Sequence, residues 1–523
     1  MQKNKLNFLK IILLPVVLIF IFLTLPNNSQ GANFSLEITN IKPAGTGSPA
    51  IPSTNRIFRA YPGIEYNIRA AVIGGLYPYT YSLSNQPEGM TINYRTGEIS
   101  WPNPQSDSGI ITLSVTDSEN NTVTTTWEIT ISTSGFIFVN GSYAGTETGT
   151  IDQPYRSLRN LLDNETNLTD IVYFRSGIYQ MVEHNNGSPY GMNLSSSPSA
   201  WLAYPGENVV LQGGSDVGQA RRIAIFKTFY FDGLTVKDVV DYGIMTSGSF
   251  NYKTVRGCVF DGLVPKDDIN NNYGFIHTTN DSPGYYFVIQ DNEFKNWRQA
   301  SAIGSLYNDK KALIENNYIH DNLEEGTPTG IGITLGISPK VYVDYLTVRG
   351  NKVVMNTGNL LGGMNAAFYD SANIEINNNL FVKLEERGGH IFEWECGDHQ
   401  GDTYYWRNTL IGDLSVRCSP SGPYWVNNNV IVNPNTKGTW FASTDFITHG
   451  NFVLATVLID TNNLKNTDVY SLVNPSDEYK LIESQFAYIG THGWQLPDGL
   501  TPLELLGDIY IDPPNSPTGL SVL

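Results

Sequence analysis

The sequence predicts an all-β protein in which a β-solenoid follows a small β-sandwich. The first observation behind this prediction is an asparagine that returns once per segment, always in the same local frame. An apolar or aromatic residue lies three positions before it, and another lies two positions after it. Self-similarity at intervals of roughly 20 to 50 residues is typical of solenoid proteins. The repeated asparagines are Asn292, Asn317, Asn351, Asn379, Asn408 and Asn429.

The second observation is that the segments around these asparagines read as short strands. Short apolar runs are separated by clusters of Gly, Asn and Asp, which favours strands over helices. The frame continues upstream with the asparagine replaced, around Leu234 and Cys258, and its eight turns are 21 to 34 residues apart. An asparagine at one place in stacked coils can bond through its amide to the coils on either side. We therefore expect the six asparagines to be structural.

The composition fits this fold and excludes some partners. The chain has 523 residues, of which 41% are hydrophobic and 16% charged, so it can form a long apolar core. Lys and Arg number 32 against 50 Asp and Glu, which gives a formal net charge of −18. A field of that sign repels nucleic acid and anionic membranes. We expect no nucleic-acid partner, and the oligomeric state stays open.

Residues 1–31 have the pattern of a signal peptide. Lysines precede an apolar run that Pro26 ends, and the small residues Ser29 and Gly31 are spaced for cleavage. The run is shorter than the roughly 20 residues that span a bilayer. We expect a protein that is secreted, extracellular or at the cell surface, with the periplasm as an alternative, and that leaves the membrane once the signal is cleaved. An uncleaved anchor is the other interpretation.

The third observation is the period-two alternation of residues 33–132. Alternating segments separated by turns, at 66–72, 79–83, 109–116 and 122–131, have the spacing of a small β-sandwich. The stretch resembles the immunoglobulin-like and cadherin-like modules of bacterial surface and secreted proteins. The resemblance implies a spacer or a binding module without catalytic residues. It is carried by Pro78–Leu83, Pro87–Ile92, Thr96–Trp101 and Val115–Ser118.

A second unit, residues 136–450, follows the short linker at 132–135. It opens with the turn segment 145–150, a short helix expected over 157–162 and the apolar strand segment 171–179. This order resembles the opening of right-handed parallel β-helix proteins of the pectate-lyase-like class, in which an N-terminal helix caps the solenoid. The resemblance implies a right-handed parallel β-helix of about eight or more coils, with an N-terminal cap. It also implies polysaccharide substrates, although a fold alone does not define an activity.

The end of the chain loses the repeated frame. Residues 451–510 resemble the closing segment of the same class, through Leu472–Pro475, Tyr479–Leu481 and Ser484. Residues 511–523 form a Pro-rich tail that looks like a linker.

A polar column on the outside of the solenoid is the candidate site. Each coil has a strand upstream of its asparagine, and side chains alternate between the two faces of a strand. We align these strands so that Ile276, Ile303, Ile333, Phe368, Phe392 and Val416 point inward. The alignment places His277, Gly304, Thr334, Tyr369, Glu393 and Arg417 in one outward column, with Glu395 on the same face as Glu393.

The column suits the β-elimination of a uronic-acid glycan. This reaction needs a base for the proton α to the uronate carboxylate, for which His277 and Tyr369 are candidates. It also needs a positive group beside that carboxylate, either Arg417 or a Ca²⁺ ion. The candidate calcium ligands are Glu393, Glu395 and Asp398.

The same glutamates also suit glycoside hydrolysis. Residues i and i+2 of a strand are about 6 to 7 Å apart at Cα. Hydrolases use carboxylate pairs about 5 Å apart when they retain configuration and about 6.5 to 9.5 Å apart when they invert it. A solvated strand face is the alternative interpretation of Glu393 and Glu395, and a structural hydrogen-bonded residue is the alternative for His277.

Other residues are candidates for substrate binding. Arg387 and Lys340 could bind an acidic sugar, and Trp297 and Tyr307 could stack on sugar faces. The chain lacks the Trp-Ile-Asp-His and Arg-x-Pro-x-x-Arg segments of calcium-dependent pectate lyases, and the paired aspartates and Gly-His-Gly of polygalacturonases. Glu393-Trp394-Glu395 resembles the acidic pair of alginate and dermatan lyases, without the lysine that follows it there.

The three cysteines do not make a disulfide scaffold. Cys396 lies 12 residues before Asn408 and Cys418 lies 11 before Asn429, so the two occupy nearly the same place in consecutive coils. Stacked strands are about 4.8 Å apart, within the range of a disulfide. A Cys396–Cys418 bridge and two buried thiols are both compatible with this spacing.

These observations leave several functional hypotheses. The first is a secreted enzyme that degrades an extracellular polysaccharide, with a lyase ahead of a hydrolase. The second is a non-catalytic carbohydrate-binding or adhesion protein. An epimerase, which shares the proton abstraction of a lyase, is a third.

Overall fold

The computed structural model describes parts of residues 34–460. Residues 1–33 and 461–523 lie outside this description. So do residues 48–49, 166–169, 182–191, 195–199, 215–222, 226–228, 247–251, 265–273, 279–283, 299, 307–308, 324–333, 339–343, 356–360, 369–372, 384–391, 397–400, 412–413, 418–423, 428, 434–438, 442–445, 450–451 and 456–457.

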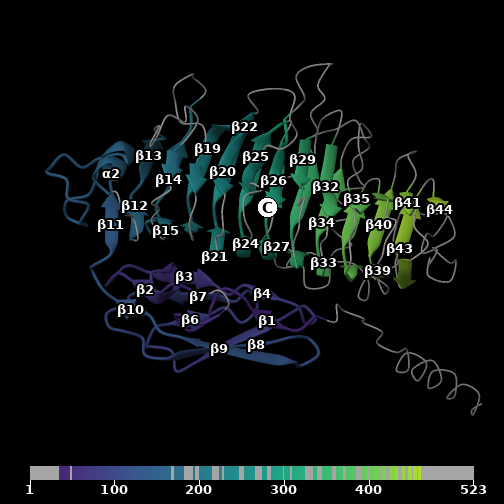
Figure 1. Cartoon of the computed structure of the whole chain (residues 1–523), viewed down its shortest axis with the longest axis horizontal. Coiled ribbons are helices and arrows are strands. Elements are labelled where there is room, and N and C mark those ends of the chain that lie inside the picture. The colour runs from purple at the N-terminus through teal and green to yellow at the C-terminus, as the bar shows by residue number, and fades with distance from the viewer. Residues whose placement is uncertain are drawn as a thin grey trace, which may run out of the picture.

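The larger unit is a parallel β-helix in which each coil contributes one strand to each of three sheets (Figure 1). Sheet A consists of β11 (Phe136–Val139), β12 (Ile171–Phe174), β15 (Ala200–Ala203), β18 (Tyr230–Asp232), β21 (Tyr252–Arg256), β24 (Gly284–Gln290), β27 (Asp309–Glu315), β30 (Tyr345–Arg349), β33 (Asn373–Asn377), β36 (Thr403–Trp406), β39 (Tyr424–Asn427) and β42 (Phe446–His449).

The other two sheets follow in the same coils. Sheet B consists of β13 (Gly177–Gln180), β16 (Val209–Gln212), β19 (Thr235–Val240), β22 (Val259–Val264), β25 (Glu293–Trp297), β28 (Tyr318–Ile319), β31 (Lys352–Met355), β34 (Leu380–Lys383), β37 (Thr409–Ile411), β40 (Val430–Asn433) and β43 (Phe452–Ala455). Sheet C consists of β14 (Met192–Leu194), β17 (Ile223–Ile225), β20 (Tyr242–Thr246), β23 (Gly274–Thr278), β26 (Ser301–Leu306), β29 (Thr334–Ile337), β32 (Leu361–Phe368), β35 (Phe392–Cys396), β38 (Leu414–Arg417), β41 (Thr439–Phe441) and β44 (Leu458–Asp460).

The corner between sheet A and sheet B has the same geometry in seven consecutive coils. The residue just before the repeated position has a positive φ, between 53° and 71°. Gly, Asn and Asp adopt this left-handed conformation most readily, and they hold all but one of these corners. Arg407 is the exception. The seven residues are Gly233, Gly257, Asp291, Asn316, Gly350, Asn378 and Arg407.

The predicted asparagine ladder is present at this corner. Each of the first five asparagines donates from Nδ2 to Oδ1 of the next, at 2.9 to 3.1 Å. Each Nδ2 also donates to a backbone carbonyl of the preceding coil, as Asn351 does to Ile314 at 2.9 Å. Cys258 occupies the ladder position upstream, and its N–H donates to Asn292 Oδ1. The ladder therefore satisfies buried polar groups while fixing the register of the coils.

The solenoid core confirms the predicted frame. Residues three before and two after each ladder position are buried in a single apolar cluster, wherever the structure describes their side chains. The ring of Phe294 stacks on that of Phe260 in the neighbouring coil, with centroids 4.9 Å apart. At the N-terminal end, α2 (Leu158–Asn164) lies over the first coils and buries Leu158, Leu161 and Leu162 against them. This is the expected cap.

The N-terminal module is a small β-sandwich. Three-stranded sheets form from β3 (Tyr66–Arg69), β7 (Glu98–Trp101) and β6 (Thr91–Ile92), and from β5 (Thr80–Ser84), β8 (Ile111–Thr116) and β9 (Thr122–Trp127). Two-stranded pairs form from β1 (Glu37–Ile38) and β4 (Val72–Ile73), and from β2 (Arg59–Ala60), which follows the 3₁₀ turn η1 (Arg56–Phe58), and β10 (Thr130–Ile131). Tyr66, Ile99 and Trp127 lie in its core.

The module lies along sheet A of the solenoid rather than apart from it (Figure 1). Near the N-terminal cap, Tyr61 and Ile64 pack against Phe136 and Phe138. Nine coils further on, Leu76 packs against Trp406. Because these apolar contacts span most of the described length of sheet A, the two units form one body.

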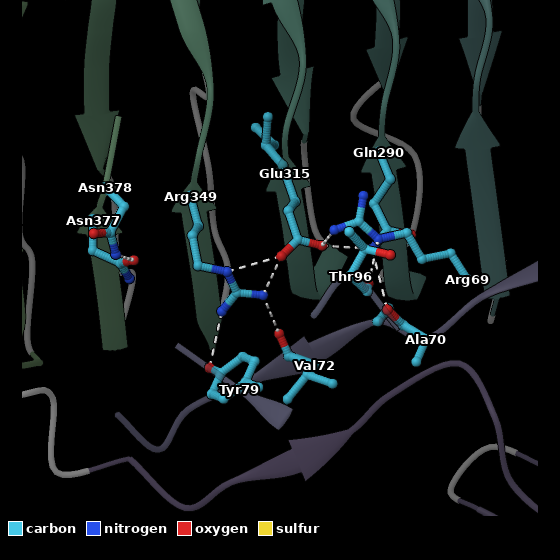
Figure 2. A network of polar contacts seen from close by, with 12 residues as sticks. Arg69, Ala70, Val72, Tyr79, Thr96, Gln290, Glu315, Arg349, Asn377 and Asn378 are labelled. Atoms are coloured by element: carbon cyan, nitrogen blue, oxygen red, sulfur yellow. Dashed lines mark hydrogen bonds and ion pairs between the residues drawn. The ribbon is translucent and has the colours of Figure 1, made fainter. Parts of the chain in front are cut away.

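Buried charges cross this interface (Figure 2). Glu315 of β27 accepts from Arg349 Nε at 2.9 Å and Gln290 Nε2 at 2.6 Å, and Arg69 of the module lies 3.5 Å away. Arg349 also donates to Tyr79 Oη and to the Val72 carbonyl of the module, each at 2.9 Å. Burial alone would raise the pKa of Glu315, but Arg349 and Arg69 outweigh it and hold that pKa below its ordinary value. The interface thus carries an ionised, fully paired carboxylate.

Candidate functional site

The strand pairing in sheet C places partly different residues in the candidate column than the sequence alignment did. The core row runs Ile276, Ile303, Ile337, Met364, Phe392, Leu414. The expected alignment had Ile333, Phe368 and Val416 in this row, and these assignments are wrong by four, four and two residues. The connections between sheets B and C vary in length, and no repeated polar residue marks the strands of sheet C.

The alternation of the strands then defines the opposite row. Position 277 is followed by Ser338, Asn365, Glu393 and Ser415 in later coils, with a bulge at β26. His277 and Glu393 therefore share a row, as expected, but four coils separate them. At about 4.8 Å per coil this is roughly 19 Å. The strand pairing thus confirms the shared row, but at this distance the two residues cannot act on the same bond.

Thr334 does not join the row. Thr334 pairs with Leu361, three positions before the core residue Ile337. Phe368 pairs with Cys396, whereas the alignment required Phe392. Tyr369 itself lies outside the described residues, and its proposed role as a base stays a prediction.

The strands β32, β35 and β38 do gather part of the expected site. Glu393 and Glu395 are two residues apart on β35, so both positions are on the face opposite the core row. Arg417 pairs with Glu395, whereas the sequence alignment had placed it beside Glu393. Asn365 of β32 pairs with Glu393 and was missed, because the four-residue error had put Tyr369 in its place. Two acidic positions, one cationic and one amide position are thus neighbours on three consecutive coils.

His277 lies in a more enclosed place than a solvent-facing base would. Its relative exposure is 6%, and its ring packs against Tyr242 of the preceding coil, with centroids 4.9 Å apart. Beside it, Thr246 donates to Thr278 at 3.0 Å, and both are buried. These contacts favour the structural interpretation of His277.

The predicted substrate and metal residues have different outcomes. Trp297 is fully buried in the solenoid core, so its expected role in stacking on a sugar is wrong. Arg387, Lys340, Tyr307 and Asp398 lie outside the described residues, and their roles stay predictions. Within the described part of the chain, no group of three or more His, Cys, Asp or Glu side chains is gathered to hold a metal ion.

The choice between a Cys396–Cys418 bridge and two buried thiols stays open, because Cys418 lies outside the described residues. The pairing of Glu395 with Arg417 immediately precedes the two cysteines. Cys258, the third cysteine, is a buried thiol whose pKa is raised to about 12 by burial.

A second polar cluster lies on the outer face of sheet B. His320 has Glu293 Oε1 at 3.0 Å from one ring nitrogen and Asp321 Oδ2 at 2.9 Å from the other. Lys295 donates to the same Glu293 oxygen at 2.9 Å, and the ring of His320 stacks on Tyr318. Lys295 is a counter-charge for Glu293, and such contacts are typical of a surface ion-pair network.

Comparisons with known proteins agree with the two units. Residues 48–132 match the family model described as "Putative Ig domain", and residues 223–398 match that described as "Right handed beta helix region". The molecule is therefore a right-handed parallel β-helix protein with an N-terminal Ig-like module. This architecture fits a carbohydrate-active or surface protein. The comparison with curated proteins gives no match.

One solved structure is similar to part of the chain. Its title describes a putative alpha-galactosidase from Bacteroides fragilis, and it has 13% sequence identity and a TM-score of 0.16. The alignment covers 33% of this chain and 46% of that one, so the chain spans about half the length of its counterpart. A likeness this low carries no argument about activity. Separately, none of the helices in the described residues is long and apolar enough to cross a membrane.

Proposed function

We propose that the protein is a secreted enzyme that cleaves a uronic-acid-containing polysaccharide, with its site on sheet C at β32, β35 and β38. The observation that carries the proposal is the register that makes Arg417 a neighbour of Glu395 and Asn365 a neighbour of Glu393. Flat strand faces repeated along a solenoid suit a long polymer, because successive sugars can lie across successive coils.

In the proposed reaction, Arg417 binds the uronate carboxylate and stabilises the negative charge that develops on it. A base removes the proton from the carbon α to that carboxylate. The electrons form a carbon–carbon double bond, and the bond to the glycosidic oxygen on the β carbon breaks. A proton then returns to the departing oxygen, so that one unsaturated and one ordinary chain end result. Tyr369 is the remaining predicted base, since His277 is four coils from Glu393.

Calcium is a second way to neutralise the uronate. The carboxylates of Glu393 and Glu395 are the oxygen ligands that Ca²⁺ prefers, and their positions share one strand face. Asp398 would be the third ligand. A bound cation would reduce the repulsion between an acidic substrate and a chain of net charge −18.

Glycoside hydrolysis is the second candidate reaction. The positions of Glu393 and Glu395 are about 6 to 7 Å apart at Cα, which is compatible with an acid and base pair. A hydrolase would act through the two glutamates, whereas a lyase also depends on Arg417. A binding or adhesion protein remains the non-catalytic alternative.

The test is incubation with a panel of uronic-acid and neutral glycans, with and without calcium. Ultraviolet absorbance of unsaturated uronates reports elimination, and reducing ends without that absorbance report hydrolysis. We expect Arg417→Met to remove elimination, and Glu393→Gln or Glu395→Gln to lower turnover at least 100-fold in either reaction. Glu293→Gln on sheet B is the matched control. Binding without any new chain ends would overturn the enzymatic proposal in favour of a binding protein.

A further inference from the structure

Two glutamates are buried in sheet A, and their surroundings are opposite. Glu315 and Glu375 have relative exposures of 3% and 0%. Glu315 is met by two guanidinium groups and an amide. Glu375 of β33 has no basic group within ion-pair distance among the described residues. The same interface therefore holds one carboxylate as an anion and gives the other no ion-pair partner among the described residues.

The two carboxyl oxygens of Glu375 differ in their hydrogen bonding. Oε1 accepts from Asn377 Nδ2 at 2.8 Å and from Trp406 Nε1 at 3.3 Å. Oε2 is buried and has no hydrogen-bond partner within the described part of the chain. Thr347 pairs with Glu375 on the neighbouring strand, and its hydroxyl is also buried without a partner. An ionised carboxylate in such a place is costly, whereas a protonated one is tolerated.

The module is what encloses this part of sheet A. Phe34 stands edge-on to the rings of Tyr345 and Tyr404, at 4.7 and 5.2 Å between centroids. Leu76 packs on Trp406, the residue whose indole donates to Glu375. Separation of the module from these strands would open the face to which Glu375 belongs.

We propose that Glu375 is a protonation switch that holds the Ig-like module on the C-terminal half of sheet A while its carboxyl is neutral and weakens that contact when it ionises. The switch concerns the contact between the units and is independent of the site on sheet C. When Glu375 ionises, the module changes from being packed on the C-terminal half of sheet A to being released from it.

The direction of the pH dependence follows from linkage. Burial raises the pKa of Glu375 to about 7 from its ordinary value of 4.5, against the opposing effect of Arg349. The docked state therefore binds more protons than the undocked state between these two values. Docking is strongest below pH 4.5 as far as Glu375 is concerned, weakens as the pH rises, and stops changing above about 7. The docking equilibrium would fall about 70-fold between about pH 5 and about pH 8.

Other titratable groups around Glu375 do not reproduce this behaviour. Glu315, beyond Arg349, has a lowered pKa, so its contribution is lost only as the pH falls below its ordinary value. Tyr345 on β30 and Tyr77 and Tyr79 on the module all have pKa values raised by burial. Arg349 stays charged throughout. Among these groups, a change in docking between about pH 5 and pH 8 is thus attributed to Glu375.

The experiment is hydrogen–deuterium exchange of the full chain at about pH 5, 6, 7 and 8, corrected for the intrinsic exchange rate. We expect peptides from β33, β36 and residues 72–79 of the module to lose protection as the pH rises. Peptides from β25, on sheet B, are the internal reference and should not change. In Glu375→Gln, which is neutral at every pH, the loss of protection should disappear, whereas Glu315→Gln should weaken docking across the whole range.

An equal pH slope in wild type and Glu375→Gln would overturn the proposal, and so would a wild-type protein without any slope. If Glu375→Gln does not fold, infrared difference spectroscopy of the wild type against Trp406→Phe supplies the test. A buried protonated carboxyl should be lost near pH 7 in the wild type. It should persist to higher pH in Trp406→Phe, which lacks one donor to the ionised form. Absence of that carboxyl band at about pH 6 would also overturn the proposal.

Discussion

Sheet A and sheet C belong to the same coils, yet they differ in what fixes them and in what their outer faces meet. Sheet A leads into a corner where a left-handed residue and a ladder asparagine recur, and its register runs without a shift from β24 to β36. Sheet C has a register irregularity at β26 and no repeated polar residue. The module packs on the outer face of sheet A between β11 and β36. The described polar contacts of the module with the strands of the solenoid fall on sheet A or its corner. The register of the coils can therefore be predicted from the sequence where the same hydrogen bonds repeat. It is harder to predict where loops of varying length precede the strands.

The largest expected effect comes from breaking the charged contact on sheet A. Glu315→Leu leaves Arg349 and Arg69 buried without their shared carboxylate. Removing one partner of a buried ion pair costs about 3–5 kcal/mol. We expect the free energy of unfolding to fall by that amount in urea denaturation. Glu293→Leu, which removes a half-exposed pair on sheet B, should cost no more than about 1 kcal/mol. Equal losses would mean that water reaches the interface.

The corner ladder should come next. Asn351→Ala removes the acceptor for two donors of Asn317 and the donor to Asn379 and Ile314. Each buried polar group left without a partner costs about 1–3 kcal/mol, so a loss of about 2–4 kcal/mol is expected. Asn164→Ala, at the exposed end of α2, should change stability by less than about 0.5 kcal/mol. Calorimetry of both variants checks this, and a ladder variant as stable as the control would contradict a structural ladder.

The same contrast between sheet A and sheet C explains which features of the fold could be predicted from the sequence. The ladder, the inward residues around it and the capping helix were predictable because each follows from a repeated local frame. The face of sheet A that contacts the module also has a pattern in the sequence. It lies two residues before the ladder positions. Arg256, Gln290, Glu315, Arg349 and Asn377 are polar residues there that point outward yet are buried. All of these residues except Asn377 have partners in the module, more than 180 residues away along the chain, as Asn67 is from Arg256, and no local pattern pairs them.

The candidate site was harder to predict for a physical reason. Membership of a row on sheet C depends on the length of the connection that precedes each strand. The connection from β28 to β29 runs from Ile319 to Thr334, whereas that from β25 to β26 runs only from Trp297 to Ser301. The alternation of Glu393 and Glu395 within one strand was predictable, but their neighbours were not. A four-residue error upstream replaced Asn365 with Tyr369.

Arg407 gives a finer test of the corner, because it is the one corner residue there whose side chain disfavours a positive φ. Its φ is 53°, and it is anchored by a 3.1 Å bond from Nη1 to the Tyr77 carbonyl of the module. Arg407→Gly and Arg407→Ala both lose this bond, but only alanine keeps the backbone strain. Glycine should therefore be more stable than alanine by about 1 kcal/mol. Equal thermal midpoints would show that this corner does not need the left-handed conformation.

The smallest expected effect on stability is on sheet C. Glu393→Gln and Glu395→Gln change positions on the face opposite the core row, on strands where the described contacts of the module do not fall. Substitutions at such positions usually change stability by less than about 0.5 kcal/mol. We expect both variants to unfold in urea at the wild-type midpoint while turnover falls. A loss comparable to that of Glu315→Leu would show that sheet C also buries paired charge. The two sheets would then differ in sequence but not in role, and the site would have to be sought elsewhere on the solenoid.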